Sequence, residues 1–409
     1  MEDILTLVRE YINNKPKKDW VAGEDWVQYS GPSFDAEEYV SGIQSLLGGW
    51  FILGKKGREF ETKFSKMLGK KDGILVNSGS SANLLMVSLM KTKRGGSLPE
   101  GSKFITPVVC FPTTINPLIQ NGFEPVFVDV ELPNLNLNLD QVEDILEKDT
   151  NKEIKGIIFA HVLGNPPDMD RLMNIIKKYD LTFLEDSCDA LGSTWKGEPL
   201  GSFGHVSTCS FFPAHHMTMG EGGFVATNSL SHRSALASLR DWGRACYCNT
   251  KKPGDVTCGT ACGNRFHSWF KGAQDIIYDH RYVFTEIGYN LKPTEMQAAM
   301  GLAQLDKLEQ MHLARKKNFK RLTDILSKHS EYLHLPTMHP NADVSWFGYL
   351  VTIKDDSPFE KQDLVNFLEA SKVQTRSYFT GNALLHPAYS EFAQKYENPL
   401  TEFPDATKS

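Results

Sequence analysis

The sequence predicts an α/β protein built on a mostly parallel sheet with helices on both faces. Short apolar runs alternate with helix-like segments along the chain. Continuous runs, without alternation of apolar and polar residues, are typical of strands buried on both faces. Ligands of such sheets bind beyond the carboxyl ends of the strands. The predicted strands are Gly73–Val76, Phe104–Pro107, Glu124–Val130, Gly156–His161 and Thr182–Asp186.

A chain of 409 residues is long enough for one large and one small domain. We expect an N-terminal helix and linker over residues 1–40, a large α/β domain over 41–305 and a small α+β C-terminal domain over 306–409. A long helix from about Thr294 to Ser327 should lead into the small domain, where Trp346–Val351 should form a strand.

The charge and the ends of the chain exclude several classes of function. The net charge is −6, whereas a nucleic-acid surface needs a basic patch. No run of eighteen apolar residues is present, so we expect no membrane span. The N-terminus lacks the basic start and apolar run of a signal peptide. We therefore expect a cytoplasmic protein whose seven cysteines are thiols, metal ligands or redox groups, not disulfides.

Polar motifs follow the predicted strands. Asn77-Ser-Gly-Ser-Ser-Ala82 lies between a strand and a helix, where free N–H groups and hydroxyls suit a phosphate. Serine-rich helix caps are also common, so this motif alone decides little. Asp186 ends another strand, and a carboxylate there needs a partner to stay charged. An N-cap for the next helix is the alternative role for Asp186.

The stretch Ser210–Gly223 joins a histidine pair to a Gly-Glu-Gly-Gly turn. The glycines permit positive φ and a close approach of the backbone. Unperturbed imidazole changes charge near neutral pH, so the pair places a titratable group in a tight corner. On these residues alone, a hairpin with hydrogen-bonded structural histidines is the simpler interpretation.

This stretch resembles the fold-type I sugar aminotransferases that act on nucleotide-linked keto-sugars. In that family a lysine between Ser-Phe and Gly-Glu-Gly-Gly binds pyridoxal phosphate covalently. His215 stands at the lysine position, and imidazole has no primary amine to form that bond. The nucleotide-sugar 3-dehydrases of the family show the same replacement. The resemblance therefore implies an aspartate aminotransferase-like fold, pyridoxamine phosphate as cofactor, and dehydration with His215 as the base.

The resemblance also implies roles for the other motifs. The cofactor phosphate would be held by Gly79, Ser80, Ser81 and Ser210. Phe111 would stack on the pyridine ring, and Asp186 would pair with the pyridine nitrogen. Asp189 matches the dehydrases, although Phe212 stands where they often have tyrosine. Asn290, in Gly-Tyr-Asn, would reach the cofactor phosphate of a neighbouring subunit and so implies a homodimer.

The cysteines form a second motif. Thiolates at positions 246, 248, 258 and 262 would suit either a structural zinc or an iron–sulfur cluster, and the spacing slightly favours zinc. The resemblance to iron–sulfur 3-dehydrases for a CDP-linked sugar implies a [2Fe-2S] cluster in a loop over about 244–270. Its ligands would be Cys188, Cys246, Cys248 and Cys262, with Cys258 the alternative to Cys262. Cys110 and Cys209 are expected to be ordinary buried thiols.

The function implied by the resemblance is removal of the C3 hydroxyl of a nucleotide-linked 4-keto-6-deoxyhexose. CDP-4-keto-6-deoxy-D-glucose is the favoured substrate, with TDP as the other nucleotide. The electrons would come from a separate NADH-dependent flavin/iron–sulfur reductase, on the way to 3,6-dideoxyhexoses of bacterial surface polysaccharide such as O-antigen. A cluster-free dehydratase or aminotransferase with structural zinc is the alternative. Family chains extend further, so a truncation after Ser409 is left open.

Overall fold

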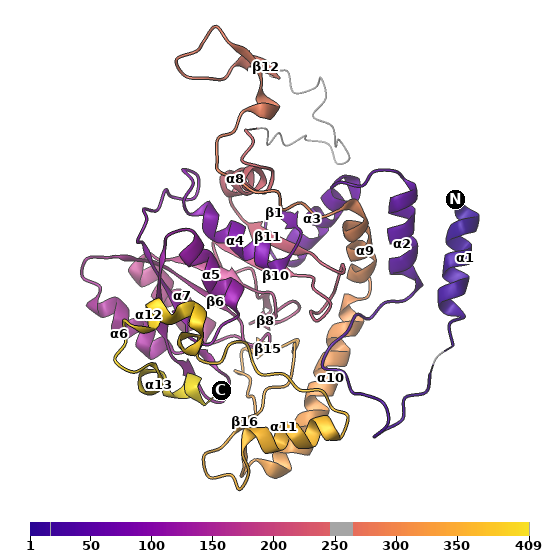
Figure 1. Ribbon diagram of the computed structural model, residues 1–409, viewed down its shortest axis with the longest axis vertical. Helices are drawn as coiled ribbons and strands as arrows, with labels where there is room; N and C mark the ends of the chain where they lie inside the picture. The colour runs from indigo at the N-terminus through magenta and orange to yellow at the C-terminus, as the bar shows by residue number, and fades with distance from the viewer. Residues whose placement is uncertain (17, 246–264, 409) are drawn as a thin grey trace.

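A seven-stranded sheet forms the centre of the computed structural model, which describes residues 1–16, 18–245 and 265–408. The strand order is β1-β11-β10-β7-β6-β2-β3 (Figure 1). Within this sheet β11 runs antiparallel to both of its neighbours, and the other pairs are parallel. The mostly parallel sheet is thus confirmed. The strands are β1 (Asp72–Val76), β2 (Lys103–Pro107), β3 (Glu124–Val128), β6 (Ile154–Ala160), β7 (Thr182–Asp186), β10 (Val206–Ser210) and β11 (Gly223–Thr227).

Helices cover both faces of this sheet because neighbouring strand residues point to opposite sides. On β6, Ile157 packs in one hydrophobic cluster and Ile158 in another. The cluster around Ile158 includes residues of α4 (Gly79–Leu89) and α8 (Leu230–Arg240). The other face is covered by α6 (Leu139–Lys148), α7 (Met169–Tyr179), α3 (Lys55–Met67) and α9 (Glu295–Leu305).

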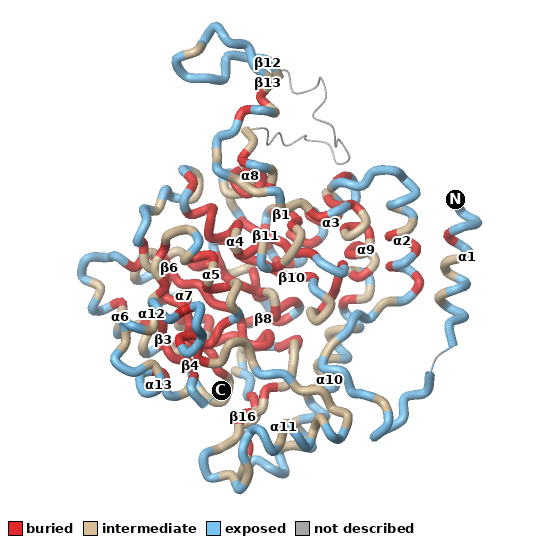
Figure 2. Tube along the Cα trace, viewed as in Figure 1, coloured by how far each residue is buried: buried red, intermediate tan, exposed pale blue. Residues whose placement is uncertain are grey.

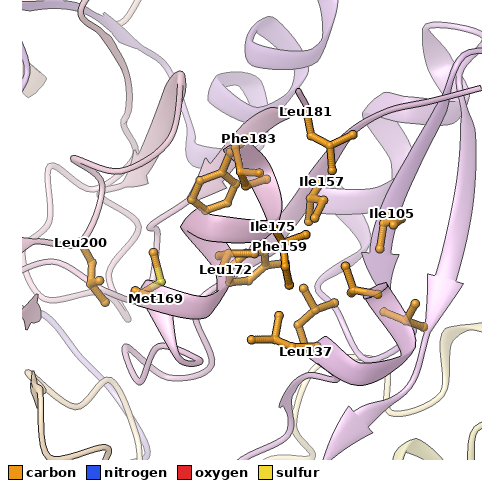
Figure 3. Close-up of a cluster of buried hydrophobic side chains, with 14 of the residues drawn as sticks. Ile105, Leu137, Ile157, Phe159, Met169, Leu172, Ile175, Leu181, Phe183 and Leu200 are labelled. Atoms are coloured by element: carbon orange, nitrogen blue, oxygen red, sulfur yellow. The ribbon is translucent and has the colours of Figure 1, made fainter. Parts of the chain in front are cut away.

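The core is concentrated in and around the sheet, where most of the residues coloured as buried in Figure 2 lie. Figure 3 shows the cluster between the sheet and α7, in which Phe159 and Phe183 project from adjacent strands. Their rings stack with centroids 5.4 Å apart. Burying one such side chain contributes about 2–3 kcal/mol. Because both faces of the sheet are buried, the residues on both faces are apolar, and each strand therefore is a continuous apolar run.

The N-terminal helix α1 (Glu2–Asn13) lies outside α2 (Ala36–Leu47), which packs against α9 (Figure 1). Asp35 caps α2 through a capping box with Glu38. At the top of the view, β12 (Phe266–Ser268) and β13 (Ile277–Asp279) form a hairpin that projects from the body (Figure 1).

The predicted long helix is wrong, because it consists of two helices. The first, α9, ends at Leu305, and α10 (Leu308–Leu326) begins three residues later. At the break, Lys307 pairs with Asp35 and with the fully buried Glu38. The small C-terminal region is built on α10 together with α11 (Lys361–Ala370), β14 (Leu333–His334) and β16 (Thr352–Ile353).

The predicted strand Trp346–Val351 is also wrong, since regular pairing starts only at β16. Side chains form hydrogen bonds with backbone carbonyls that a neighbouring strand would otherwise bind. His216 bonds the carbonyl of Ser345, and Arg315 donates to the carbonyls of Trp346 and Phe347. An apolar run can therefore be buried without forming a sheet ladder.

The remaining elements are short, and the last of them return to the large sheet. The backbone N–H groups of Asp405 and Ala406 donate to the Asp129 carboxylate just after β3. In the described part of the chain, no helix has the length and apolar character needed to cross a membrane. The other elements are α5 (Pro112–Gln120), β4 (Val130–Glu131), β5 (Asn136–Leu137), β8 (Thr194–Trp195), β9 (Glu198–Pro199), β15 (Ala342–Asp343), α12 (Ser390–Ala393), α13 (Pro399–Glu402) and α14 (Pro404–Thr407).

Candidate active site

The candidate site lies along one edge of the sheet, where β1, β2, β7 and β10 all end. These strands point the same way, so the residues that follow them are neighbours. Gly79, after β1, is in contact with Ser210 at the end of β10. Asn83 of α4 donates to Asp186 at the end of β7. The structure thus brings together motifs that are far apart in the sequence.

The N-terminus of α4 provides a surface suited to a phosphate. Ser78 caps the helix by accepting a bond from the N–H of Ser81 at 3.1 Å. The hydroxyl of Ser80 lies 2.9 Å from that of Thr113. Uncapped N–H groups and the helix dipole favour an anion at such an end. The Ser210 hydroxyl lies against the same turn, beside Gly79.

Close packing at Gly79 leads to the first testable prediction. A Cβ added there would lie 2.4 Å from Ser210 Cβ, so Gly79→Ala must displace the helix start from β10. We expect a loss of about 1–3 kcal/mol of stability and weaker binding of pyridoxal or pyridoxamine phosphate. Melting temperature and a cofactor titration measure the two effects. Gly31→Ala, where the nearest atom is 3.6 Å away, is the control and should change neither.

Asp186 is a buried carboxylate held by three hydrogen bonds. Its Oδ2 accepts from Asn83 at 2.7 Å and from the Thr114 hydroxyl at 2.8 Å. Its Oδ1 accepts from the Cys188 N–H at 3.0 Å. Each carboxylate oxygen can accept two bonds, so Oδ1 keeps one site for a further donor. That remaining site suits the N–H of a protonated ring nitrogen.

His215 lies beside Asp189, with Nδ1 at 3.4 Å from Asp189 Oδ1. Burial raises the pKa of the Asp189 carboxyl, while His215 and Arg315 partly offset the rise. Among the residues that the structure describes, His215 Nδ1 and Asp189 Oδ2 make no hydrogen bond. Asp189 Oδ2 is therefore a candidate for contact with a ligand or water, whereas His215 Nδ1 faces Asp189 Oδ1 at ion-pair distance.

The neighbouring His216 has a different environment. It is buried, and its Nε2 bonds the carbonyl of Ser345 at 2.6 Å. Burial lowers the pKa of His216 well below its usual value. His312 bonds the Ser345 hydroxyl at 2.7 Å, and burial lowers its pKa to about 4. Both imidazoles are therefore neutral structural groups near pH 7, which leaves His215 as the accessible member of the pair.

Phe111 is the N-cap residue just before α5 and is about half exposed, so its ring is available to a ligand. Phe379, from the C-terminal segment, packs edge-on against it at 5.8 Å. Thr380 donates to the carbonyl of Cys110, which ties this segment to the loop after β2. Phe212 is exposed to a similar extent and, as a phenylalanine, contributes no hydroxyl.

Of the cysteines predicted to bind the cluster, the structure describes Cys188 alone. Cys188 follows Asp186, and burial raises the pKa of its thiol well above the usual value. A metal would reverse that effect by binding the thiolate. Cys246, Cys248, Cys258 and Cys262 lie outside the described residues. Across the ranges that are described, no group of three or more His, Cys, Asp or Glu side chains could hold a metal ion.

Asn290 is exposed, and its backbone bridges to Asp241. The next carbonyl, of Leu291, accepts from the N–H of Asn77 at 2.9 Å. Asn290 is thus next to the start of the motif at residues 77–82 of its own chain, and its reach to a second subunit stays a prediction.

The family model of the DegT/DnrJ/EryC1/StrS aminotransferases matches residues 32–408. The chain belongs to this family. It is 42% identical over 400 residues to the dTDP-4-dehydro-2,6-dideoxy-D-glucose 3-dehydratase of Saccharopolyspora spinosa, covering 97% of this chain and 84% of that one. It is 40% identical to the lipopolysaccharide biosynthesis protein RfbH of Salmonella typhimurium, covering 98% and 90%.

Among solved structures, an Escherichia coli GDP-4-keto-6-deoxy-D-mannose-3-dehydratase with bound hydrated PLP is 30% identical, with a TM-score of 0.76. The match covers 93% of this chain and 90% of that one. A structure of GDP-4-keto-6-deoxymannose-3-dehydratase with a trapped PLP-glutamate geminal diamine has a TM-score of 0.78 at 29% identity, covering 93% and 92%. The expected fold type I of the family is confirmed, and the chain is an enzyme of a family that works with pyridoxal or pyridoxamine phosphate.

The residues present fit that cofactor. Its phosphate suits the start of α4 beside Ser210, its ring nitrogen suits Asp186, and its ring face suits Phe111. Sequence reasoning missed the residues that hold these groups in place, notably Asn83, Thr114 and Arg315. Asn83 and Thr114 each stand close behind a predicted motif. For Asn83, a polar residue just before the apolar run Leu84–Val87 was the available signal, whereas the helix of Thr114 is mixed in polarity and gives none. No comparable signal distinguishes Arg315 from its basic neighbours on α10.

Proposed function

We propose that the chain is a pyridoxamine-phosphate-dependent 3-dehydratase of a nucleotide-linked 4-keto-6-deoxyhexose. The observation that carries this proposal is His215, an accessible imidazole beside Asp189 at the position where aminotransferases of the family have the cofactor lysine. Relatives at 42% and 33% identity are named as 3-dehydratases of dTDP- and GDP-linked sugars. An imidazole without a primary amine supports dehydration over transamination.

In this proposal each site residue binds a particular part of the cofactor. Gly79, Ser80, Ser81 and Ser210 bind the cofactor phosphate. Asp186 pairs with the ring nitrogen, and Phe111 stacks on the ring. Asn290 of a second copy completes the phosphate site in a homodimer. When bound, pyridoxamine phosphate supplies a primary amine that condenses with the C4 ketone, and a ring that takes up electrons.

His215 has the geometry of a general base. Its Nδ1 faces Asp189, so a proton on Nδ1 would be stabilised by the carboxylate and Nε2 would be free to accept another. We infer that Nε2 takes the proton from the C4′ carbon, which allows the C3 hydroxyl to leave. The neighbouring Asp189 then stabilises the imidazolium that results.

Completion of the reaction needs two electrons. We propose that Cys188, Cys246, Cys248 and Cys262 hold a [2Fe-2S] cluster, which would supply one-electron transfer from a separate NADH-dependent flavin/iron–sulfur reductase. CDP-4-keto-6-deoxy-D-glucose is the favoured substrate, and the product would be a precursor of 3,6-dideoxyhexoses. The relation to a lipopolysaccharide biosynthesis protein supports this destination.

The deciding experiment combines metal analysis with a substrate panel. Protein prepared anaerobically should contain about two irons and two sulfides per chain and show visible absorption. With pyridoxamine phosphate it should release the C3 oxygen of the preferred sugar among CDP-, dTDP- and GDP-linked 4-keto-6-deoxyhexoses. Amino transfer to the sugar from glutamate, without loss of the C3 oxygen, would instead establish an aminotransferase. Stoichiometric zinc without iron would remove the electron-transfer part and leave a dehydratase with a structural metal.

A further inference from the structure

Arg315, on α10, is a partly buried cation that joins three backbone carbonyls from two separate segments. Its Nη2 donates to the carbonyl of His215 at 3.2 Å. Its Nη1 donates to the carbonyls of Trp346 and Phe347, at 3.2 and 3.1 Å. Guanidinium carries five N–H donors in a rigid plane, which a lysine ammonium cannot reproduce. Arg315 therefore connects the backbone of the candidate base directly to the C-terminal region.

The face of α10 that carries Arg315 also contacts residues 345–347, the segment that packs against His215 and His216. His312, Arg315 and Phe319 are spaced three and four residues apart and so lie on one side of the helix. His312 bonds Ser345, and Phe319 stacks on Trp346 with centroids 3.8 Å apart. The next residue along, Phe347, lies 5.2 Å from the His215 ring, measured between ring centroids.

Helix α10 also packs closely against a second part of the site, the turn that carries Asp189. A Cβ added at Gly192, in the turn after Asp189, would lie 2.3 Å from the His312 ring. The helix therefore packs against both the turn that carries Asp189 and the segment that contacts His215. Among these contacts, the bond from Arg315 is the one that reaches the backbone of His215 itself.

We propose that Arg315 is a positioning residue that holds the His215 backbone so that the side chain at position 215 faces the C4′ carbon of the cofactor. The inference rests on the proposed function, which places C4′ at His215. This positioning role requires a group that binds all three carbonyls at once, as the guanidinium does. A lysine ammonium also has three N–H donors, but it lacks the rigid planar fork that reaches carbonyls on two separate segments.

The test uses a side chain at position 215 that reports its own direction. In full-length His215→Lys protein, a correctly aimed lysine should capture pyridoxal phosphate, and borohydride followed by mass analysis should detect the covalent product. Adding Arg315→Met should slow capture by about tenfold to 10²-fold, since small displacements of reacting groups cost rates of that order. Arg315→Lys should slow capture nearly as much. Lys317→Met, which removes an exposed charge from the same helix, should leave the rate unchanged.

A second measurement separates misplacement from a general loss of structure. In the native background, Arg315→Ala should lower kcat with little change in KM, and added guanidinium or methylguanidinium at non-denaturing concentration should restore part of the rate. Matched melting temperatures and cofactor affinities accompany each variant. Equal capture rates with and without Arg315, or rescue by Arg315→Lys alone, would overturn the positioning role.

The two hypotheses fail in different ways. If His215→Lys protein with intact Arg315 never binds pyridoxal phosphate covalently, position 215 does not face C4′ and the proposed function is wrong at its base. If capture is normal in that protein and remains normal after Arg315→Met, the proposed function stands and the inference about Arg315 falls.

Discussion

Replacing His215 with Asn should lower turnover by about 10²–10⁴-fold, the usual contribution of a general base. Asn has a similar size and keeps a polar group near Asp189, but it cannot accept a proton from carbon. The exchange of the C4′ proton with solvent should therefore be lost together with turnover. Binding of pyridoxamine phosphate should persist, because Asp186, Phe111 and the start of α4 are unchanged. Proton exchange followed by NMR and a cofactor titration measure the two effects.

His216→Asn is the informative comparison, because the two histidines are adjacent in sequence and differ in environment. His216 is buried and bonded to the Ser345 carbonyl, so its replacement should mainly reduce stability. If C4′ exchange survives in His215→Asn and disappears in His216→Asn, the base is His216, and the alignment of the stretch is wrong by one residue.

Replacing Cys246 with Ser should remove formation of the 3-deoxy product while leaving dehydration intact. Loss of one thiolate normally leaves an iron site incomplete, whereas release of the C3 hydroxyl uses only the cofactor and His215. The variant should be colourless in the visible and still exchange the C4′ proton and the C3 oxygen with solvent. With reductase and NADH supplied, it should make no 3-deoxysugar. Isotope exchange and product analysis on the same preparation separate the two half-reactions.

The control is Cys258→Ser, which should retain colour and full product formation. If Cys258 is essential and Cys262 dispensable, the cluster stands and the choice of its fourth ligand changes. If Cys246→Ser loses C3 oxygen exchange as well, the cysteines are needed for dehydration itself, and the separation of the half-reactions is wrong.

Local patterns were sufficient to predict five of the seven strands of the large sheet and the polar motifs that follow them, whereas β10 and β11 were not predicted as strands. The five apolar runs correspond to strands because each is buried on both faces, and burial on both faces leaves a direct record in composition. The motifs at the strand ends are also local, since a turn with a glycine, a serine cap or a terminal carboxylate is specified by adjacent residues. The roles given to them by resemblance remain predictions.

The sequence was less informative wherever a side chain from elsewhere satisfies the backbone. The predicted strand at Trp346–Val351 has the right composition, yet Arg315 binds its first two carbonyls and His216 binds the carbonyl of Ser345 just before it. The predicted long helix divides near Lys307, where the chain pairs with Asp35 and Glu38 far earlier in the sequence. Period and propensity describe neighbours along the chain and carry no information about such distant partners.

The sequence by itself therefore determined the mostly parallel sheet and the order of the motifs, and its resemblance to the family predicted an imidazole at the lysine position. Only the tertiary structure decided which histidine of the pair is accessible and what holds it. His216 is fixed by Ser345, and His215 lies between Asp189 and the Arg315 guanidinium. The physical reason is that burial and hydrogen bonding depend on three elements that meet only when the chain folds: the turn after β7, the loop after β10 and helix α10.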